Sequence, residues 1–202
     1  MLPASLLLSA VYFLTIPWHP FPASWMIKAA SVAILAIMAA RGRAYGLALG
    51  LAFSALGDAL LEYSPGLFVA GLVAFLLAHV AYTVTFVRAW RSARISVAAV
   101  TVVLYSASLA AWLIPAVGAL AIPVAIYVAA ITAMVASAIT ARFPSPWVAR
   151  GAVLFLISDS VLAVNRFRMP VPFEEWIVWA TYYTAQVLIA RSDKMKISPH
   201  AT

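Results

Sequence analysis

Residues 67–90 read LFVAGLVAFLLAHVAYTVTFVRAW, a run with one histidine, His79, and no charged residue before Arg88. A helix rises 1.5 Å per residue, so it needs about 20 residues to cross roughly 30 Å of hydrocarbon. This stretch therefore predicts a transmembrane helix. Similar apolar runs, separated by short polar or proline-containing breaks, fill the rest of the chain.

The composition places the whole chain in a membrane. Of its 202 residues, 66% are hydrophobic and 9% are charged, and the mean hydropathy is +1.04. No block is polar enough for a separate aqueous domain, so residues 1–202 form a single transmembrane domain. The formal charge is +7, and the basic residues stand singly or in short clusters between the apolar runs. This distribution indicates membrane topology and does not indicate nucleic-acid binding. The absence of cysteine excludes disulfides, thiolate nucleophiles and cysteine-ligated metals.

We predict an all-α, polytopic membrane bundle of eight transmembrane helices. Prolines mark most of the breaks, and the alternation that a membrane barrel requires is missing. The first run has no preceding basic residue and no small-residue cleavage site after it, so we expect a span and not a signal peptide. The predicted spans are Leu2 to Pro17, Ser24 to Ala40, Tyr45 to Glu62, Leu67 to Trp90, Ile95 to Ile114, Val117 to Thr140, Trp147 to Asn165 and Glu174 to Arg191.

Lysine and arginine collect on one side of the predicted bundle. The other side holds only Arg166 and Arg168. Under the positive-inside rule, this asymmetry predicts a protein of the cell (inner) membrane with both termini in the cytoplasm. The basic residues on the predicted cytoplasmic side are Arg41, Arg43, Arg88, Arg91, Arg94, Arg142, Arg150, Arg191, Lys194 and Lys196.

Four ionisable side chains lie inside the predicted spans, where each costs roughly 2.5 to 3.5 kcal/mol to insert. Helix rise places Lys28 and Asp58 about 6 Å, Asp159 about 9 Å and His79 about 18 Å below the outer boundary. Their shared depth predicts a polar chamber that opens outward. Further polar side chains accompany them in the middle layer and at the rim: Tyr82, Tyr127, Tyr183 and Gln186, then Asn165 and Glu62.

Structural explanations stay open for each of these residues. Lys28 lies near a span end and can extend its ammonium group to the interface. One aspartate can pair with Lys28 while the other caps a broken helix. His79 can be a core histidine, and the tyrosines can serve packing alone. The argument for a site therefore rests on the coincidence of depth.

The two aspartates lie in similar segments. Residues 56–61 read LGDALL and residues 157–162 read ISDSVL, and each aspartate is followed 24 residues later by Tyr82 or Tyr183. This pattern favours two four-helix halves related by an axis along the membrane normal. Such an arrangement would bring Asp58 and Asp159 together where the halves meet.

At these residues the chain resembles the YhhN-like lysoplasmalogenases, a family of multi-pass membrane hydrolases. The likeness covers nearly the whole chain, although the fifth predicted helix matches only in hydrophobicity. Its elements are Lys28, Gly57-Asp58 with Leu61, then Phe68, Gly71, Phe75, His79 and Tyr82, then Gly151-Ala152, Phe155 and Ser158-Asp159, and finally Tyr182-Tyr183 with Ala185-Gln186.

The resemblance implies hydrolysis of the vinyl-ether bond of a lysoplasmalogen to a fatty aldehyde and glycerophosphoethanolamine or glycerophosphocholine. Such a bond is cleaved when an acid protonates the carbon beta to oxygen and water captures the oxocarbenium ion. This chemistry needs a protonated carboxylic acid beside an ionised one. We assign the catalytic roles to Asp58 and Asp159. Lys28 and Asp58 lie at the same predicted depth, so we expect them to pair. Because a nearby cation favours an ionised carboxylate, Asp58 should stay ionised and Asp159 should be the general acid.

The remaining polar side chains are candidates for holding a lysophospholipid substrate among membrane lipids. Lys28, Arg166 and Arg168 are candidate partners of its phosphate. No cofactor is expected, and no metal site, because His19 and His200 lie outside the spans and only His79 lies at depth. The sequence leaves the oligomeric state open. We predict that substrate binding uses Lys28, His79, Tyr82, Tyr127, Asn165, Tyr183 and Gln186.

Other functions fit the same residues. A proton-coupled transporter or a lipid-moving protein also uses intramembrane carboxyls, a membrane lysine and internal repeats. Serine catalysis lacks the Gly-x-Ser-x-Gly elbow in this sequence. Turnover of a vinyl-ether lysolipid by purified protein without a gradient separates an enzyme from a carrier.

Overall fold

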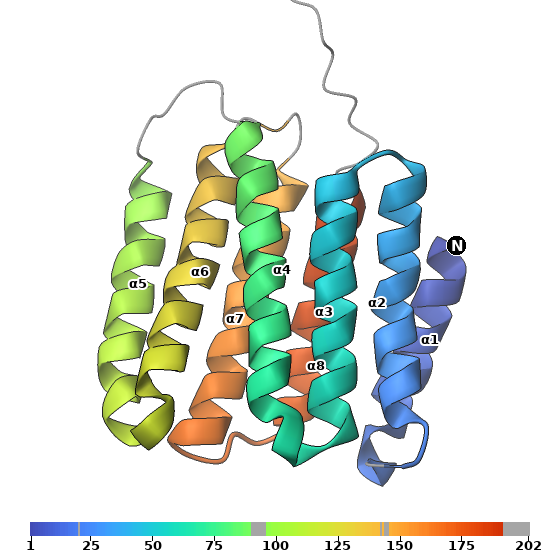
Figure 1. The fold of residues 1–202 in the computed structure, drawn as a ribbon, viewed down its shortest axis with the longest axis horizontal. Coiled ribbons are helices and arrows are strands. Elements are labelled where there is room, and N and C mark those ends of the chain that lie inside the picture. The colour runs from blue at the N-terminus through green and yellow to red at the C-terminus, as the bar shows by residue number, and fades with distance from the viewer. Residues whose placement is uncertain (20, 90–95, 142, 144–145, 192–202) are drawn as a thin grey trace, which may run out of the picture.

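A computed structural model describes residues 1–19, 21–89, 96–141, 143 and 146–191. Within these residues the chain forms eight α-helices and no strand, as predicted (Figure 1). The helices are α1 (Leu2–Thr15), α2 (Ser24–Arg41), α3 (Tyr45–Tyr63), α4 (Phe68–Arg88), α5 (Val97–Leu113), α6 (Ala121–Thr140), α7 (Trp147–Phe167) and α8 (Glu174–Ala190).

The helix ends follow local chemistry. The first helix ends before the predicted Pro17, because proline follows Ile16 and the chain tightens into a 3₁₀ turn over Ile16–Trp18. Helix α5 begins after Ser96, whose hydroxyl accepts a hydrogen bond from the Ala99 amide at 3.1 Å. Several predicted features lie outside the described residues: Pro20, Trp90, Arg91, Arg94, Ile95, Arg142, Pro144, Lys194, Lys196 and His200.

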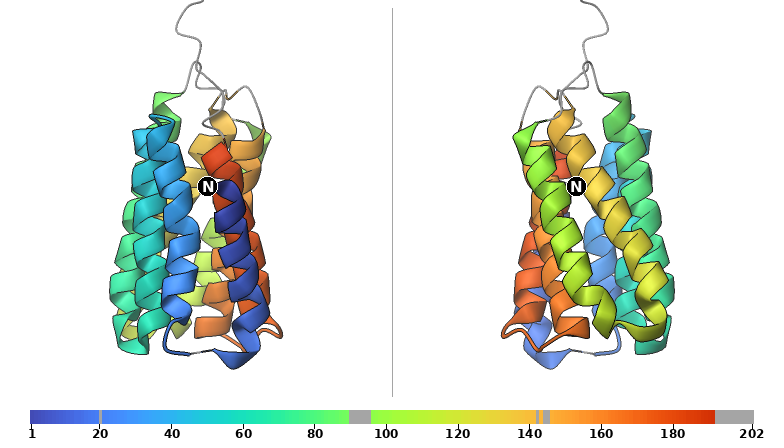
Figure 2. Two further views of the ribbon diagram at one scale, coloured as in Figure 1. Left: turned by 90° about the vertical axis from the view of Figure 1, so that its right-hand side faces the viewer. Right: turned by 90° about the vertical axis from the view of Figure 1, so that its left-hand side faces the viewer.

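The eight helices stand side by side along one direction, and consecutive helices pack as antiparallel neighbours, except that α6 and not α5 packs against α4 (Figure 1). The pattern of contacts is similar in the two halves: α1–α2, α2–α3 and α3–α4 correspond to α5–α6, α6–α7 and α7–α8. Contacts α4–α6 and α2–α8 join the halves. In side view, α2 and α3 lie opposite α1 and α8 (Figure 2). This pattern agrees with the predicted pair of four-helix halves, whose symmetry stays a prediction.

An aromatic cluster fills the centre of the bundle. Phe75 of α4, Phe155 of α7 and Tyr182 of α8 contact one another edge to face, with ring centroids 5.2 to 6.2 Å apart. Pairs of this geometry contribute beyond the apolar area they bury. The cluster therefore brings together three helices that come from both halves.

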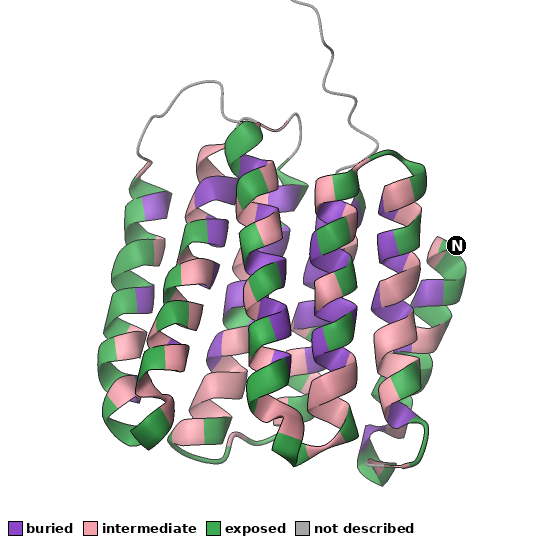
Figure 3. Ribbon diagram, in the orientation of Figure 1, coloured by how far each residue is buried: buried purple, intermediate pink, exposed green. Residues whose placement is uncertain are grey.

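Many side chains exposed on the outside of the helices are large and hydrophobic, in contrast to the surface of a soluble protein. Figure 3 shows where the exposed positions lie on the helices. Along α4, exposed valines and a leucine recur at helical spacing at positions 69, 73, 77, 80, 84 and 87. An uninterrupted apolar face of this kind fits contact with lipid tails.

Six helical segments are long and apolar enough to cross a membrane; α1, with its 3₁₀ turn, is a shorter apolar segment. Helix α8 has 17 residues and begins with two glutamates. Of the eight described helices, six meet the length and hydropathy of a full span, and the count of eight spans stays a prediction. The described basic residues Arg41, Arg43, Arg88, Arg150 and Arg191 share one end of the bundle.

We predict that Gly151→Ala destabilises the bundle. A Cβ at this position would lie 2.9 Å from the Ala185 carbonyl oxygen, a backbone atom that cannot turn away. Overpacking of this kind costs about 1 to 3 kcal/mol in free energy of unfolding. Gly66→Ala is the matched control, since its nearest neighbour would be Ser64 Oγ at 3.7 Å. Thermal unfolding in detergent measures both variants, and equal midpoints would contradict close packing of α7 on α8.

Candidate active site

A cavity of about 320 Å³ opens at the end of the bundle opposite the basic loops. We call it the polar chamber. All five acidic residues in the described part of the chain line it, although they come from three different helices. Its ionisable and polar lining is Tyr12, Lys28, Asp58, Glu62, Tyr127, Ser158, Asp159, Asn165, Arg166, Glu174, Glu175 and Tyr182. The polar chamber predicted from depth is therefore present, with both predicted catalytic aspartates on its wall; that it opens to the outer side of the membrane stays a prediction.

Asp58 enters the chamber from the last turns of α3. The residue is 3% exposed, and its Oδ2 accepts a hydrogen bond from the Tyr182 hydroxyl of α8 at 2.6 Å. Gly57 beside it lets α4 approach, because a Cβ there would lie 2.6 Å from the Phe75 ring. Helices α3, α4 and α8 thus hold this carboxyl group in one position.

Asp159 enters from α7 and has a similar partner. Its Oδ2 accepts a hydrogen bond from the Tyr127 hydroxyl of α6 at 2.5 Å. The His79 Nε2 atom of α4 lies 4.0 Å from the same oxygen. Among the described residues, no hydrogen bond reaches the second oxygen of either aspartate. Each carboxyl group therefore has one oxygen held by a tyrosine and one without a hydrogen bond to a described residue.

The ion pair of Lys28 differs from the prediction. Its Nζ lies 3.3 Å from Glu62 Oε2, so Glu62 and not Asp58 is its carboxylate partner. The Tyr12 hydroxyl donates to the same oxygen at 2.7 Å. The ammonium group also lies 5.1 and 5.8 Å from the ring centroids of Tyr12 and Trp179. Glu62 follows Asp58 by one helical turn, which places its longer side chain nearer the lysine at the rim.

His19 extends this cluster at the outer end, in the connection after α1. Its Nδ1 lies 3.5 Å from Glu62 Oε1, and its ring tilts against Tyr12 and Phe21. Burial lowers the pKa of His19 below 6.5, while the Glu62 charge opposes that shift. Tyr12, Lys28 and Glu62 line the chamber on the side of α1 and α2, and His19 contacts Tyr12 and Glu62 without lining it.

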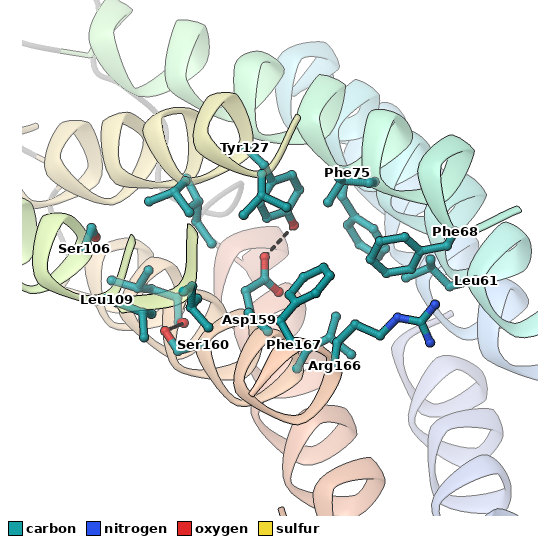
Figure 4. A pocket seen from close by; sticks show the side chains of 18 residues that line it. Leu61, Phe68, Phe75, Ser106, Leu109, Tyr127, Asp159, Ser160, Arg166 and Phe167 are labelled. Carbon is teal, nitrogen blue, oxygen red and sulfur yellow. Dashed lines mark hydrogen bonds between the residues drawn. The ribbon is translucent and has the colours of Figure 1, made fainter. Parts of the chain in front are cut away.

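A second, apolar pocket of about 70 Å³ adjoins the polar chamber, between α4, α5, α6 and α7 (Figure 4). Leucine, valine, isoleucine and phenylalanine side chains dominate its wall. Asp159 and Tyr127 line both spaces and lie at their boundary. The residues common to both are Leu61, Phe68, Phe75, Tyr127, Asp159, Leu162 and Arg166.

Four of the predicted substrate-binding residues lie outside both spaces. The Tyr82 hydroxyl donates to Gln186 Oε1 at 2.8 Å, and the Tyr183 hydroxyl contacts Ser5 Oγ at 2.6 Å. His79 is fully buried behind Asp159, against the Tyr127 and Phe155 rings. These side chains join helices within the core, so their predicted contact with substrate has no support in the geometry.

The other predicted substrate-binding residues do reach the chamber. Lys28, Tyr127 and Asn165 line it. The side-chain oxygen of Asn165 accepts a hydrogen bond from the Val171 amide at 2.9 Å, so this residue also holds the connection between α7 and α8. Among the described residues no group of three histidine or acidic side chains could hold a metal ion.

Sequence reasoning overlooked several chamber residues. From the sequence, Tyr182 stood out only as part of a tyrosine pair, and Tyr12 did not stand out at all. Glu62 was assigned to the rim, although its spacing of four from Asp58 places both on one helix face. Glu174 and Glu175 begin α8 and face the same opening.

A family model described as YhhN family matches residues 23–192. The chain belongs to the YhhN family. The chain is 33% identical over 153 residues to lysoplasmalogenase TMEM86A of Bos taurus, and this match covers 71% of the chain and 62% of the relative. It is 38% identical over 173 residues to a lysoplasmalogenase of Mycobacterium tuberculosis, and this match covers 79% of the chain and 66% of the relative.

The human lysoplasmalogenase TMEM86A is similar at 34% identity over 155 residues, or 71% of this chain and 62% of the relative. The chain thus spans less than two thirds of the length of these relatives. No solved structure matches it. Membership confirms the resemblance found in the sequence, and together with the six long apolar helices it identifies a multi-pass membrane protein.

We predict that Glu62→Gln lowers the pKa of His19 further. The Glu62 carboxylate favours the protonated imidazole of His19 and so raises its pKa, whereas burial lowers it. Without the Glu62 charge, the lowering by burial is opposed less. Nuclear magnetic resonance titration of His19 in detergent measures the change, with Glu174→Gln as the control for a chamber carboxylate that does not act on His19. An unchanged or raised pKa in Glu62→Gln would contradict the contact between these two side chains.

Proposed function

We propose that this protein hydrolyses the vinyl-ether bond of lysoplasmalogens, releasing a fatty aldehyde and glycerophosphoethanolamine or glycerophosphocholine. Three relatives named lysoplasmalogenase support the substrate class. The observation that carries the proposal is the position of Asp159 at the boundary between the polar chamber and the apolar pocket. A vinyl-ether bond joins the polar glycerol part of the lipid to its hydrocarbon chain, so it requires its acid at such a boundary.

The chemistry needs one proton and one water molecule. An acid transfers its proton to the carbon beta to the ether oxygen, and the carbon–carbon double bond supplies the electron pair. Water adds to the resulting oxocarbenium carbon and loses a proton to a carboxylate. The hemiacetal then breaks its carbon–oxygen bond, which gives the aldehyde and the glycerol hydroxyl. Two carboxyl groups in different environments divide these tasks.

Asp159 is the general acid in this scheme, and Asp58 is the carboxylate that stabilises the oxocarbenium ion and accepts a proton from water. The Tyr127 hydroxyl donates to one oxygen of Asp159, so the proton that this residue transfers is carried on its other oxygen. Asp58 lines the polar chamber alone and not the apolar pocket, which suits contact with water. Lys28 lines the same chamber, although its direct partner is Glu62.

The membrane arrangement belongs to the same proposal. All eight helices cross the cell (inner) membrane, as two four-helix halves, with both termini in the cytoplasm and the polar chamber open to the outer side. The basic residues at the opposite end of the bundle support this orientation. A single-chain lipid would then enter with its headgroup in the polar layer and its tail among the helices.

We predict that Asp159→Asn and Asp58→Asn each lower kcat by at least about 100-fold, the range of a lost general acid or base. Hydrolysis of a lysoplasmenylethanolamine by purified protein in detergent measures the rate. Binding of the corresponding alkyl-ether lysolipid, which has no double bond, checks that both variants still hold the lipid. Near-normal turnover in both would contradict the two-carboxylate mechanism.

A second prediction concerns the origin of the new proton. Turnover in deuterium oxide should place one deuterium on the carbon next to the aldehyde carbonyl, because protonation at carbon is the first step. Mass spectrometry of the aldehyde, trapped as a hydrazone as it forms, measures the label. An aldehyde released without that deuterium would contradict carbon protonation, and wild-type protein that leaves the lysolipid intact would favour a carrier.

A further inference from the structure

Three basic side chains lie near the chamber opening, and their surroundings differ. Lys28 is engaged by Glu62 and by two aromatic rings. The Arg168 guanidinium lies 4.9 Å from the Trp112 ring centroid, and Arg168 lines neither the polar chamber nor the apolar pocket. Arg166 lines both. An arginine at the end of a membrane helix often only extends its charge to the membrane interface. That role would not explain why Arg166 lines two adjoining cavities.

Arg166 also has no anionic partner among the described residues. The three ion pairs that these residues form involve His19, Lys28 and His79, each with a carboxylate. The Arg166 guanidinium instead lies 4.8 Å from the Phe68 ring centroid, a contact that orients it without neutralising its charge. The chamber therefore offers one cation with unused hydrogen-bond donors.

The position of Arg166 relative to Asp159 is fixed by α7. The two residues are seven positions apart on one continuous helix, which is two turns and returns to nearly the same face. The rise of 1.5 Å per residue separates them by roughly 10 Å along the axis, with Arg166 toward the outer end. Both side chains border the apolar pocket, with Arg166 beside Phe68 (Figure 4).

This separation matches the distance between the two reactive parts of a lysoplasmalogen. Seven covalent bonds join the vinyl carbon that accepts the proton to the phosphorus atom. An extended covalent chain covers roughly 1.1 to 1.2 Å per bond, so these bonds span about 8 Å. A phosphate held at Arg166 would therefore leave the vinyl-ether bond beside Asp159, with the hydrocarbon chain directed to the apolar pocket.

We propose that Arg166 binds the phosphate of the lysophospholipid and thereby sets the position of the vinyl-ether bond at Asp159. The inference rests on the proposed function and adds the group that recognises the headgroup. A guanidinium presents paired donors to two phosphate oxygens, which fixes orientation as well as distance. Glu174 and Glu175 line the same chamber, so the amine of a zwitterionic headgroup has carboxylates to face.

The test compares two substrates that differ in the phosphate alone. Wild-type protein, Arg166→Gln and Arg166→Lys are assayed in detergent with a lysoplasmenylethanolamine and with a 1-alkenylglycerol, which lacks the phosphate. Arg168→Gln is the matched control, because it removes the same charge from the same helix end without touching either cavity.

For Arg166→Gln we expect kcat/KM with the phospholipid to fall about 10- to 100-fold, the loss expected for a charge-assisted hydrogen-bonded pair. The value for the 1-alkenylglycerol should stay within about twofold of wild type. Arg166→Lys should lie between wild type and Arg166→Gln for the phospholipid, since lysine keeps the charge and loses the paired donors. Arg168→Gln should match wild type with both substrates.

Two results would overturn the inference. Equal losses with both substrates would mean that Arg166 acts on Asp159 or on the fold, and an unchanged phospholipid value would place the phosphate elsewhere. Binding of an alkyl-ether lysophospholipid and of a 1-alkylglycerol, measured in parallel, needs no turnover. If wild-type protein cleaves neither vinyl ether, the proposed function fails, while a selective loss of phospholipid binding in Arg166→Gln still supports the phosphate site.

Discussion

A carboxyl group inside a hydrocarbon layer must have a hydrogen-bond partner or face water, because its desolvation costs several kcal/mol. The structure meets this constraint twice in the same manner. Tyr182 of α8 donates to Asp58 of α3, and Tyr127 of α6 donates to Asp159 of α7. In both cases the carboxyl group also borders the polar chamber. The first hydrogen bond joins the two halves and the second joins the neighbouring helices α6 and α7, so helix packing and the candidate chemistry depend on the same contacts.

The cluster at the chamber mouth meets the same constraint with charge. Lys28 is inside a membrane helix, yet Glu62 lies within 3.3 Å and two aromatic rings cover it. Because Glu62 takes this cation, Asp58 is left with a neutral donor as its direct partner. The two catalytic candidates therefore have more similar surroundings than a Lys28–Asp58 pair would give them. Their difference lies instead in what they border, since only Asp159 reaches the apolar pocket.

The sequence predicted the helices well because the hydrocarbon thickness sets their length, and it predicted the aspartates because charged residues at depth are rare. Depth does not determine which face of a helix a residue occupies. Adjacent residues point about 100° apart, so Tyr182 faces the chamber while Tyr183 bonds Ser5 on the other side. The same limit explains why Tyr82 and Gln186, at suitable depth, bond each other within the core.

Among the described residues, the lining of the chamber lacks the arrangement that serine-catalysed ester hydrolysis requires. Ester hydrolysis by a serine requires a nucleophile within hydrogen-bond reach of a base. Ser158 is the one serine on the chamber wall, and its hydroxyl donates to the Val178 carbonyl oxygen at 3.1 Å. His79, the histidine buried nearest the aspartates, makes no hydrogen bond to it among the described residues. Vinyl-ether cleavage needs only a proton donor, a carboxylate and water, and two aspartates beside a polar cavity satisfy that requirement.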